Sequence, residues 1–262
     1  MQLTIAGLQH PGTPGDVEAN LATIAEAAAE ARARGADVLV TPEMFVTGYN
    51  IGGQVAELAA GPLVERVAQL AADTGIALVA GLPERLADGT VANTALFVDE
   101  RGAEVTRYRK THLFSDLDRT LFVEGTRRSE VVTYRGVRLA LLVCYDVEFP
   151  EPVRAAAREG AHVVVVPTAQ MEPFTFVAET LIGVRAWENQ VYVAYVNRSG
   201  AEGDLRYVGR SSVAAPSGQV LDALAPTEPV GLVLATVDTD VVEQAQRDNP
   251  YLDDLRLDLY PS

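Results

Sequence analysis

Short apolar runs alternate with longer amphipathic stretches along most of this chain. The apolar runs are rich in Val, Ile and Leu and are bounded by Gly or Pro, a pattern that predicts strands. These strands are expected at residues 2–9, 36–43, 76–84, 90–99, 105–113, 137–145, 162–169, 191–200, 209–218 and 230–238. Apolar residues recur at helical spacing over residues 16–36, 63–75, 150–161 and 176–190, which predicts helices between the strands. The alternation is typical of an α/β domain.

The two halves of the chain repeat one unit: a strand, an Ala-rich helix, a Gly-Ala pair and a buried strand that ends in Pro. The end of the unit reads "RGADVLVTPE" in the first half and "EGAHVVVVPTA" in the second. Such a repeat predicts two related layers whose sheets pack face to face with helices outside. No Ser-, Gly- or Pro-rich linker separates the halves, so we expect one domain over residues 1–262, of which 241–262 form a tail packed on the body or on a partner subunit.

The composition of the chain limits which partners it could bind and in which cellular compartment it could lie. The chain has 36 Asp and Glu against 21 Lys and Arg, and the formal net charge of -15 is the wrong sign for nucleic acid or anionic membrane surfaces. The N-terminus lacks the features of a signal peptide, and no apolar run approaches the ~20 residues that span a bilayer. One cysteine and three scattered histidines give no zinc-site pattern. We therefore expect a cytoplasmic protein without a metal ion.

Three polar residues at the ends of predicted strands could act together. Cys144, the only cysteine, follows an apolar strand and precedes a helix start, where a thiol pKa should fall below its usual ~8.5. Taken alone, Cys144 is better explained as a small buried apolar residue, and Glu43 and Lys110 as surface residues. Together they supply a nucleophile, a base and a cation, which are the groups needed to attack an acyl carbon.

The segments around these residues resemble the signature motifs of one family. Glu43 lies in "TPEMFVTGY", Lys110 in "RKTHLF" and Cys144 in "LLVCYDVEFPE", in the family's order and spacing. The likeness continues through "RAWENQVYVAYVNRSG", "GRSSVAAPSGQVL" and "NPYLDDLRLDLY". The chain thus resembles the amidase-like members of the nitrilase superfamily of carbon-nitrogen hydrolases.

The resemblance implies a four-layer α-β-β-α sandwich and thiol chemistry without a cofactor. Glu43 would be the general base and Cys144 the nucleophile, and the Lys110 ammonium and the Tyr145 backbone N–H would stabilise the oxyanion. The expected reaction converts a small carboxamide into a carboxylic acid and ammonia through a thioester. The resemblance also implies a homodimer or larger homo-oligomer.

One position departs from the family pattern. Many members carry a second glutamate between the lysine and the cysteine, and that position falls on Asp118 in this chain. An aspartate is one methylene shorter, so its carboxylate need not reach Lys110 or the substrate. Glu124 is the nearby alternative, but it is more simply explained as a surface acid.

The remaining candidates concern the substrate pocket. Thr168 and Gln170 end a strand expected beside that of Cys144, so their loop is the best candidate for shaping the pocket, and Glu148 is expected at the site entrance. His112 suggests a Cys-His dyad, although that would leave Glu43 and Lys110 unexplained. Arg185, Glu188 and Asn189 are expected to form a hydrogen-bonded set at a helix end, with Trp187 in packing or at an interface.

Other activities fit the same residues. A nitrilase would use Cys144 through a thioimidate, and an N-carbamoyl amidohydrolase would need a basic clamp such as Arg198 or Arg210. A non-catalytic binding protein on the same fold is a more distant alternative.

Overall fold

A six-stranded sheet is built mainly from the first half of the chain. The computed structural model describes residues 1–225 and 228–259. In this sheet the spatial order is β14 (Gly231–Asp238), β1 (Gln2–Gln9), β2 (Val38–Val40), β3 (Ala77–Arg85), β4 (Val91–Val98) and β5 (Glu104–Arg109). The strands β1, β2 and β3 run parallel, and the flanking pairs are antiparallel.

The second sheet repeats this arrangement with the second half of the chain. Its spatial order is β13 (Val220–Ala223), β12 (Ser212–Ala214), β9 (Tyr192–Asn197), β8 (Val163–Thr168), β7 (Val137–Leu141) and β6 (Val132–Tyr134). Its three central strands, β7, β8 and β9, are again parallel. A separate hairpin consists of β10 (Ala201–Glu202) and β11 (Leu205–Arg206).

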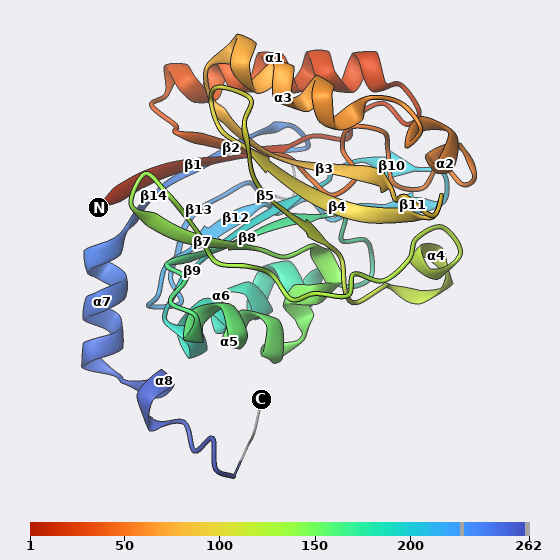
Figure 1. Cartoon of the computed structure of the whole chain (residues 1–262). Helices are drawn as coiled ribbons and strands as arrows, with labels where there is room; N and C mark the ends of the chain where they lie inside the picture. The colour runs from red at the N-terminus through yellow and green to blue at the C-terminus, as the bar shows by residue number, and fades with distance from the viewer. Residues whose placement is uncertain (226–227, 260–262) are drawn as a thin grey trace.

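Helices cover the outer face of each sheet (Figure 1). The first sheet is covered by α1 (Val17–Ala33) and α3 (Leu63–Thr74), and the second by α5 (Pro150–Arg158) and α6 (Ile182–Asn189), with the π-helical turn η2 (Val177–Leu181) leading into α6. Shorter helical elements are α2 (Gln54–Leu58), α4 (Ser115–Arg119), the 3₁₀ helix η1 (Cys144–Glu148), α7 (Thr239–Asp248) and α8 (Tyr251–Asp254).

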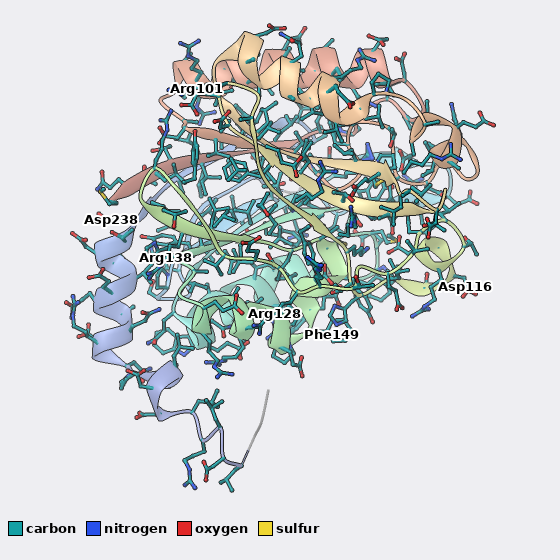
Figure 2. The ribbon with its side chains drawn as sticks, viewed as in Figure 1. Arg101, Asp116, Arg128, Arg138, Phe149 and Asp238 are labelled. Carbon is teal, nitrogen blue, oxygen red and sulfur yellow. The ribbon has the colours of Figure 1, made fainter. Side chains whose placement is uncertain are left out.

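Alternation along the strands divides the apolar residues between two cores. Val38 and Val40 point into the core between the sheets, whereas Leu39 points into the core beneath α1 and α3. Figure 2 shows side chains filling the space between these layers. Because each sheet is buried on both faces, its parallel strands are continuous apolar runs. The predicted α-β-β-α sandwich is confirmed.

The predicted strands and long helices are present with shorter bounds, and several short elements were missed. The strand expected over residues 137–145 ends at Leu141, so Cys144 begins a helical turn instead of ending a strand. The missed elements are β6, β10, β11, β13, α2, α4, α7 and α8. Most of them are too short for hydrophobic periodicity to identify.

The C-terminal segment leaves the body after one buried turn. Val242 of α7 is buried, whereas residues 256–259 are exposed, and Figure 1 shows the segment running past α5 and α6. The last part of the predicted tail, residues 260–262, lies outside the described residues. Over residues 1–225 and 228–259, no helix has both the length and the apolar character to cross a membrane.

Candidate active site

A lysine ammonium lies between two carboxylates inside the protein. Lys110 Nζ is 2.8 Å from Glu43 Oε1 and 2.6 Å from Asp118 Oδ2, and all three side chains have no solvent exposure. Burial lowers the pKa of Lys110, but the charges of Glu43 and Asp118 outweigh it and raise that pKa well above its ordinary value. The lysine is therefore held as a cation.

Glu43 is held in place by its neighbours on both sheets. The chain leaves β2 through Thr41 and Pro42, and the Glu43 N–H then donates to the Thr168 carbonyl of β8 at 3.3 Å. Asn93 of β4 donates its side-chain amide to Glu43 Oε1 at 2.7 Å. This turn also packs closely on β3 at Gly81, where an added Cβ would lie 2.3 Å from the Pro42 carbonyl oxygen.

The second Glu43 oxygen is available for proton transfer. Oε2 is buried and has no hydrogen-bond partner among the described residues. Burial raises the pKa of the Glu43 carboxyl, partly offset by the Lys110 charge and by a contact with the Cys144 thiol. A carboxylate in this environment accepts a proton more readily than an exposed one.

Asp118 reaches Lys110 although it is one methylene shorter than a glutamate. Its Oδ2 also accepts from the Phe114 N–H at 2.8 Å, and its Oδ1 accepts from the Tyr49 hydroxyl at 2.7 Å. The short helix α4 brings the Asp118 backbone inward, so no longer side chain is needed. Glu124, the alternative acid, is exposed.

Cys144 occupies a strained turn directly after Val143. Its φ is 47°, a left-handed conformation that is uncommon for residues other than glycine, and its side chain is buried. Burial and the nearby Glu43 charge raise the pKa of the thiol well above its ordinary value, with Lys110 opposing them. The raised pKa is opposite to the lowering expected from a helix start, because burial and the Glu43 charge dominate and α5 begins only at Pro150.

A narrow pocket opens beside the sulfur. Its lining is mostly aromatic and apolar, with one carboxyl and one amide group; the lining residues are Tyr49, Phe114, Cys144, Tyr145, Glu148, Gln170, Met171 and Phe174. Gln170 Oε1 is 3.9 Å from Cys144 Sγ. Burial raises the pKa of Glu148, with a hydrogen bond from Gln170 opposing it.

Three other candidate residues do not line this pocket. Thr168 does not line it: its hydroxyl donates to the Val166 carbonyl at 3.0 Å, and its own carbonyl accepts from Glu43. Arg198 is fully buried, 3.4 Å from Glu202, and Arg210 pairs with Glu179, so neither arginine lines the pocket.

The set of polar residues expected in α6 supports the turn that follows Cys144. Arg185 donates to the Val147 and Glu148 carbonyls at 2.8 and 2.6 Å and pairs with Glu188 at 2.7 Å. Asn189 donates to the Arg185 carbonyl at 2.9 Å. The predicted hydrogen-bonded set is present, and Trp187 is 47% exposed.

Sequence reasoning missed three residues of the site: Asn93 and Tyr49, which bond to Glu43 and Asp118, and Asp146, which bonds to the residues beside Cys144 and Lys110. Asn93, followed by Thr94, interrupts the apolar run of a buried strand, which is a signal for a functional polar group. Tyr49 ends the quoted Glu43 segment, and Asp146 follows Cys144 by two positions. Nothing in periodicity shows that these side chains point inward.

Comparison with known proteins identifies the family. The sequence model described as carbon-nitrogen hydrolase matches residues 4–247. A protein named "Hydrolase in pqqF 5'region" of Pseudomonas protegens is 44% identical over 98% of this chain and 90% of its own length. An (R)-stereoselective amidase of a Pseudomonas species is 38% identical, covering 95% of this chain and 90% of that protein.

A solved amidase structure is also similar to this chain. It is a mutant of the amidase from Nesterenkonia sp. AN1 that shows covalent addition of the acetamide moiety of fluoroacetamide at the active-site cysteine. The two structures match with a TM-score of 0.87 at 37% identity, over 98% of this chain and 95% of the other. The chain therefore belongs to the carbon-nitrogen hydrolase family, within the nitrilase superfamily, and is an amidase-type enzyme whose hydrolysis of amides depends on a cysteine.

Proposed function

We propose that this enzyme hydrolyses small aliphatic carboxamides to carboxylic acids and ammonia, with Cys144 as the nucleophile. The observation that carries the proposal is the buried Lys110 ammonium between Glu43 and Asp118, next to the chain's only thiol in a narrow pocket. A base, a cation and a nucleophile then surround one position for an acyl carbon.

In the first half-reaction, Glu43 takes the thiol proton on its free oxygen while Cys144 Sγ bonds to the amide carbon. The carbonyl electrons move to oxygen, and the Lys110 ammonium and the Tyr145 N–H stabilise the resulting oxyanion; one such donor contributes roughly 3–4 kcal/mol in comparable sites. Glu43 then passes the proton to the amide nitrogen, the C–N bond breaks, and ammonia leaves a thioester on Cys144.

In the second half-reaction, water replaces ammonia. Glu43 removes a proton from the water as its oxygen attacks the thioester carbon, and the same two donors stabilise the second oxyanion. The C–S bond breaks, the thiol regains its proton from Glu43, and the carboxylic acid leaves. No cofactor enters this sequence.

The pocket favours a short acyl group. Phe114, Tyr145 and Phe174 surround the space beside Cys144 with aromatic surface, and Glu148 and Gln170 supply polar groups for the carboxamide. A substrate carboxylate would find no arginine in this lining, which argues against N-carbamoyl amino acids. The acetamide adduct of the Nesterenkonia amidase places a small amide group at the cysteine of that enzyme, which supports a small substrate here.

Ammonia release from a substrate panel tests the proposal. Acetamide, propionamide and butyramide are compared with the matching nitriles and with an N-carbamoyl amino acid, using the wild-type enzyme and Cys144→Ala. We expect turnover of the amides by the wild type, a loss of at least ~10³-fold in Cys144→Ala, and an unchanged circular dichroism spectrum.

Two results would contradict this proposal. Preferred turnover of nitriles or of the N-carbamoyl compound would reassign the substrate class. Equal inactivity of both proteins on every compound would favour the non-catalytic binding function.

A further inference from the structure

Asp146 joins the segment that carries Cys144 to the segment that carries Lys110. Its carboxylate is fully buried. One oxygen, Oδ2, accepts from the Val143 N–H at 3.0 Å, immediately before the nucleophile. The other, Oδ1, accepts from the Thr111 hydroxyl and the His112 N–H, both at 3.0 Å, immediately after the lysine.

His112 adds the shortest contact to this carboxylate. Its Nδ1 lies 2.7 Å from Asp146 Oδ1, and its ring stacks on Phe149 with centroids 4.3 Å apart. Phe149 in turn packs edge-on against Tyr145 at 4.9 Å. The His112–Asp146 pair is therefore linked to the turn of Cys144 directly through the Val143 N–H and indirectly, by way of Phe149, through the Tyr145 ring.

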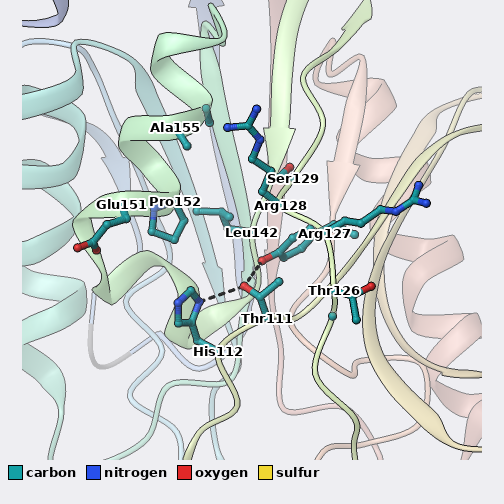
Figure 3. A pocket seen from close by; sticks show the side chains of 13 residues that line it. Thr111, His112, Thr126, Arg127, Arg128, Ser129, Leu142, Glu151, Pro152 and Ala155 are labelled. Carbon is teal, nitrogen blue, oxygen red and sulfur yellow. Dashed lines mark hydrogen bonds between the residues drawn. The ribbon is translucent and has the colours of Figure 1, made fainter. Parts of the chain in front are cut away.

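The imidazole faces a second pocket that is separate from the one beside the sulfur. This pocket has a volume of about 330 Å³, and Figure 3 shows His112 and Thr111 on its wall, hydrogen-bonded to each other, next to Glu151 and Pro152 of α5. His112 does not line the pocket beside Cys144. His112 can therefore hold Asp146 from the side of the second pocket, but it is not placed to exchange protons with the thiol.

We propose that Asp146 is a positioning residue that sets the distance and orientation between Cys144 and Lys110, and that His112 holds Asp146 in this role. The proposal rests on the proposed function of Cys144 and Lys110. This role explains why a carboxylate is buried here. Four hydrogen-bond donors converge on Asp146 from the segment of Lys110 and the segment of Cys144, whose relative position must be kept.

The turn that carries Cys144 is strained and needs hydrogen bonds to hold its shape. Cys144 has a φ of 47°, and Asp146 also donates its own N–H to the Val143 carbonyl at 3.1 Å, which closes the turn. Without the bond from the Val143 N–H, this turn can relax and move the sulfur and the Tyr145 N–H together. A misplacement of about 1 Å at a reacting group can reduce a rate by about 100-fold.

Asp146→Asn tests the carboxylate with almost no change in shape. Its amide must turn a donor towards either the Val143 N–H or the Thr111 and His112 donors, so at least one bond is lost. We expect kcat for the best amide to fall about 10- to 100-fold with KM changed less than about threefold. Alkylation of Cys144 by iodoacetamide should slow to a similar extent.

Two substitutions of His112 separate its hydrogen bond from its packing. His112→Asn keeps an N–H donor near the position of Nδ1, whereas His112→Phe keeps the stack on Phe149 and loses the donor. We expect His112→Asn to retain kcat within about threefold and His112→Phe to lose about 10-fold. The reverse order would overturn the role given to the hydrogen bond.

A spectroscopic measurement reports on the pair directly. The hydrogen bond to Asp146 raises the pKa of His112, with the charges of Glu151 and Glu124 adding to it, whereas burial lowers the pKa of His10 and of His162. In an NMR titration the highest of the three histidine pKa values should disappear in His112→Asn and fall in Asp146→Asn. An unchanged His112 pKa in Asp146→Asn would contradict the pairing.

Asp37→Asn is the matched control. Asp37 also joins two segments, because it accepts from the Thr4 N–H at 2.8 Å and pairs with Arg135, far from Cys144 in the fold. Asp37→Asn should lower the melting temperature of the protein without lowering kcat. If Asp146→Asn lost only melting temperature, like this control, the positioning role would be refuted.

The alkylation rate keeps this test independent of the proposed function. If no amide were turned over by the wild type, slower Cys144 alkylation in Asp146→Asn would still support positioning. If amides were turned over and Asp146→Asn matched the wild type in both rates, positioning would fail while the amidase function stood.

Discussion

At the residue scale, the site depends on one ammonium shared by two buried acids. Lys110 pairs with both Glu43 and Asp118 in a place where an isolated charge would be very costly. Asp118 in turn accepts from Tyr49, whose pKa is raised well above its ordinary value by burial and by the neighbouring negative charges, so the hydroxyl remains a donor. The aspartate is therefore held from both sides.

Asp118→Asn should weaken the binding of the Lys110 ammonium but leave its ion pair with Glu43. The variant loses one of the two charges that keep Lys110 protonated, and we expect kcat/KM to fall about 10- to 100-fold. Tyr49→Phe should cost less, about 3- to 10-fold, because the charge of Asp118 remains.

The double variant checks whether the two residues act through each other. The combined loss should be smaller than the product of the single losses, since each substitution breaks the same hydrogen bond. Strictly multiplicative losses would mean that Tyr49 contributes only as a wall of the pocket.

At the element scale, the close approach of β3 to the turn after β2 positions the base. Gly81→Ala would place a Cβ 2.3 Å from the Pro42 carbonyl oxygen and 2.8 Å from the Glu43 Cα, so the turn must shift. We expect a loss of at least about 10-fold in kcat, measured by ammonia release. Gly53→Ala is the control, because its Cβ meets no atom within 4 Å, and it should leave kcat unchanged.

The edge strand of the first sheet, β5, leads directly into Lys110. Glu84 of β3 pairs with Arg107 and Arg109 of β5, at 2.7 Å in each case. Burial raises the pKa of Glu84, but the hydrogen bonds and charges of the two arginines outweigh it, so the pKa is lowered. A lowered carboxyl pKa contributes stability above the unfolded value of ~4.3, and this stability is lost as the pH falls through the folded value.

Glu84→Gln should therefore reduce the free energy of unfolding by roughly 1–3 kcal/mol at pH 7. Urea denaturation of wild type and variant at several pH values measures this difference, which should shrink as the pH is lowered below about 4. The more exposed Glu104→Gln should show a smaller difference at pH 7. A Glu84→Gln difference that does not vary with pH would rule out the ion pairs as its source.

The helices and strands differ in how well they can be predicted from the sequence. Long apolar runs and amphipathic helices predict both sheets and their covering helices, because burial on each face determines their pattern. The turn of Cys144 cannot be predicted in this way, since it combines a left-handed φ with a side-chain bond from the Val143 N–H to Asp146, and neither leaves a pattern of apolar residues. Likewise, Thr168 ends the expected strand, but only the fold shows that its hydroxyl bonds within its own strand and not in the pocket.

In the whole molecule, α6 presents apolar side chains that the described residues cover only in part. Val184 and Trp187 are 42% and 47% exposed, and Tyr251 of α8 packs edge-on beside Trp187. Leu257 and Leu259 are also exposed on the segment that runs past this side of the molecule. Exposed apolar side chains grouped in this way favour association, so the predicted homo-oligomer stays our expectation.

Charged substitutions on this face test that expectation. We expect the wild type to sediment as a dimer or larger assembly, and Val184→Lys combined with Trp187→Lys to sediment as a monomer. Val241→Lys, at an exposed apolar residue of α7, is the control and should keep the wild-type assembly. A wild type that is monomeric at all concentrations would remove the basis for a partner subunit.

The burial of Cys144 has a practical consequence for handling the protein. With 6% exposure and a narrow aromatic pocket in front of it, the only sulfhydryl should react with a compact reagent such as iodoacetamide and resist a bulky aromatic disulfide such as Ellman's reagent. The native protein should then give a thiol count near zero with Ellman's reagent, and one equivalent after unfolding in urea. Preparations should also remain free of disulfide-linked dimers during storage in air, so any assembly seen by sedimentation is non-covalent.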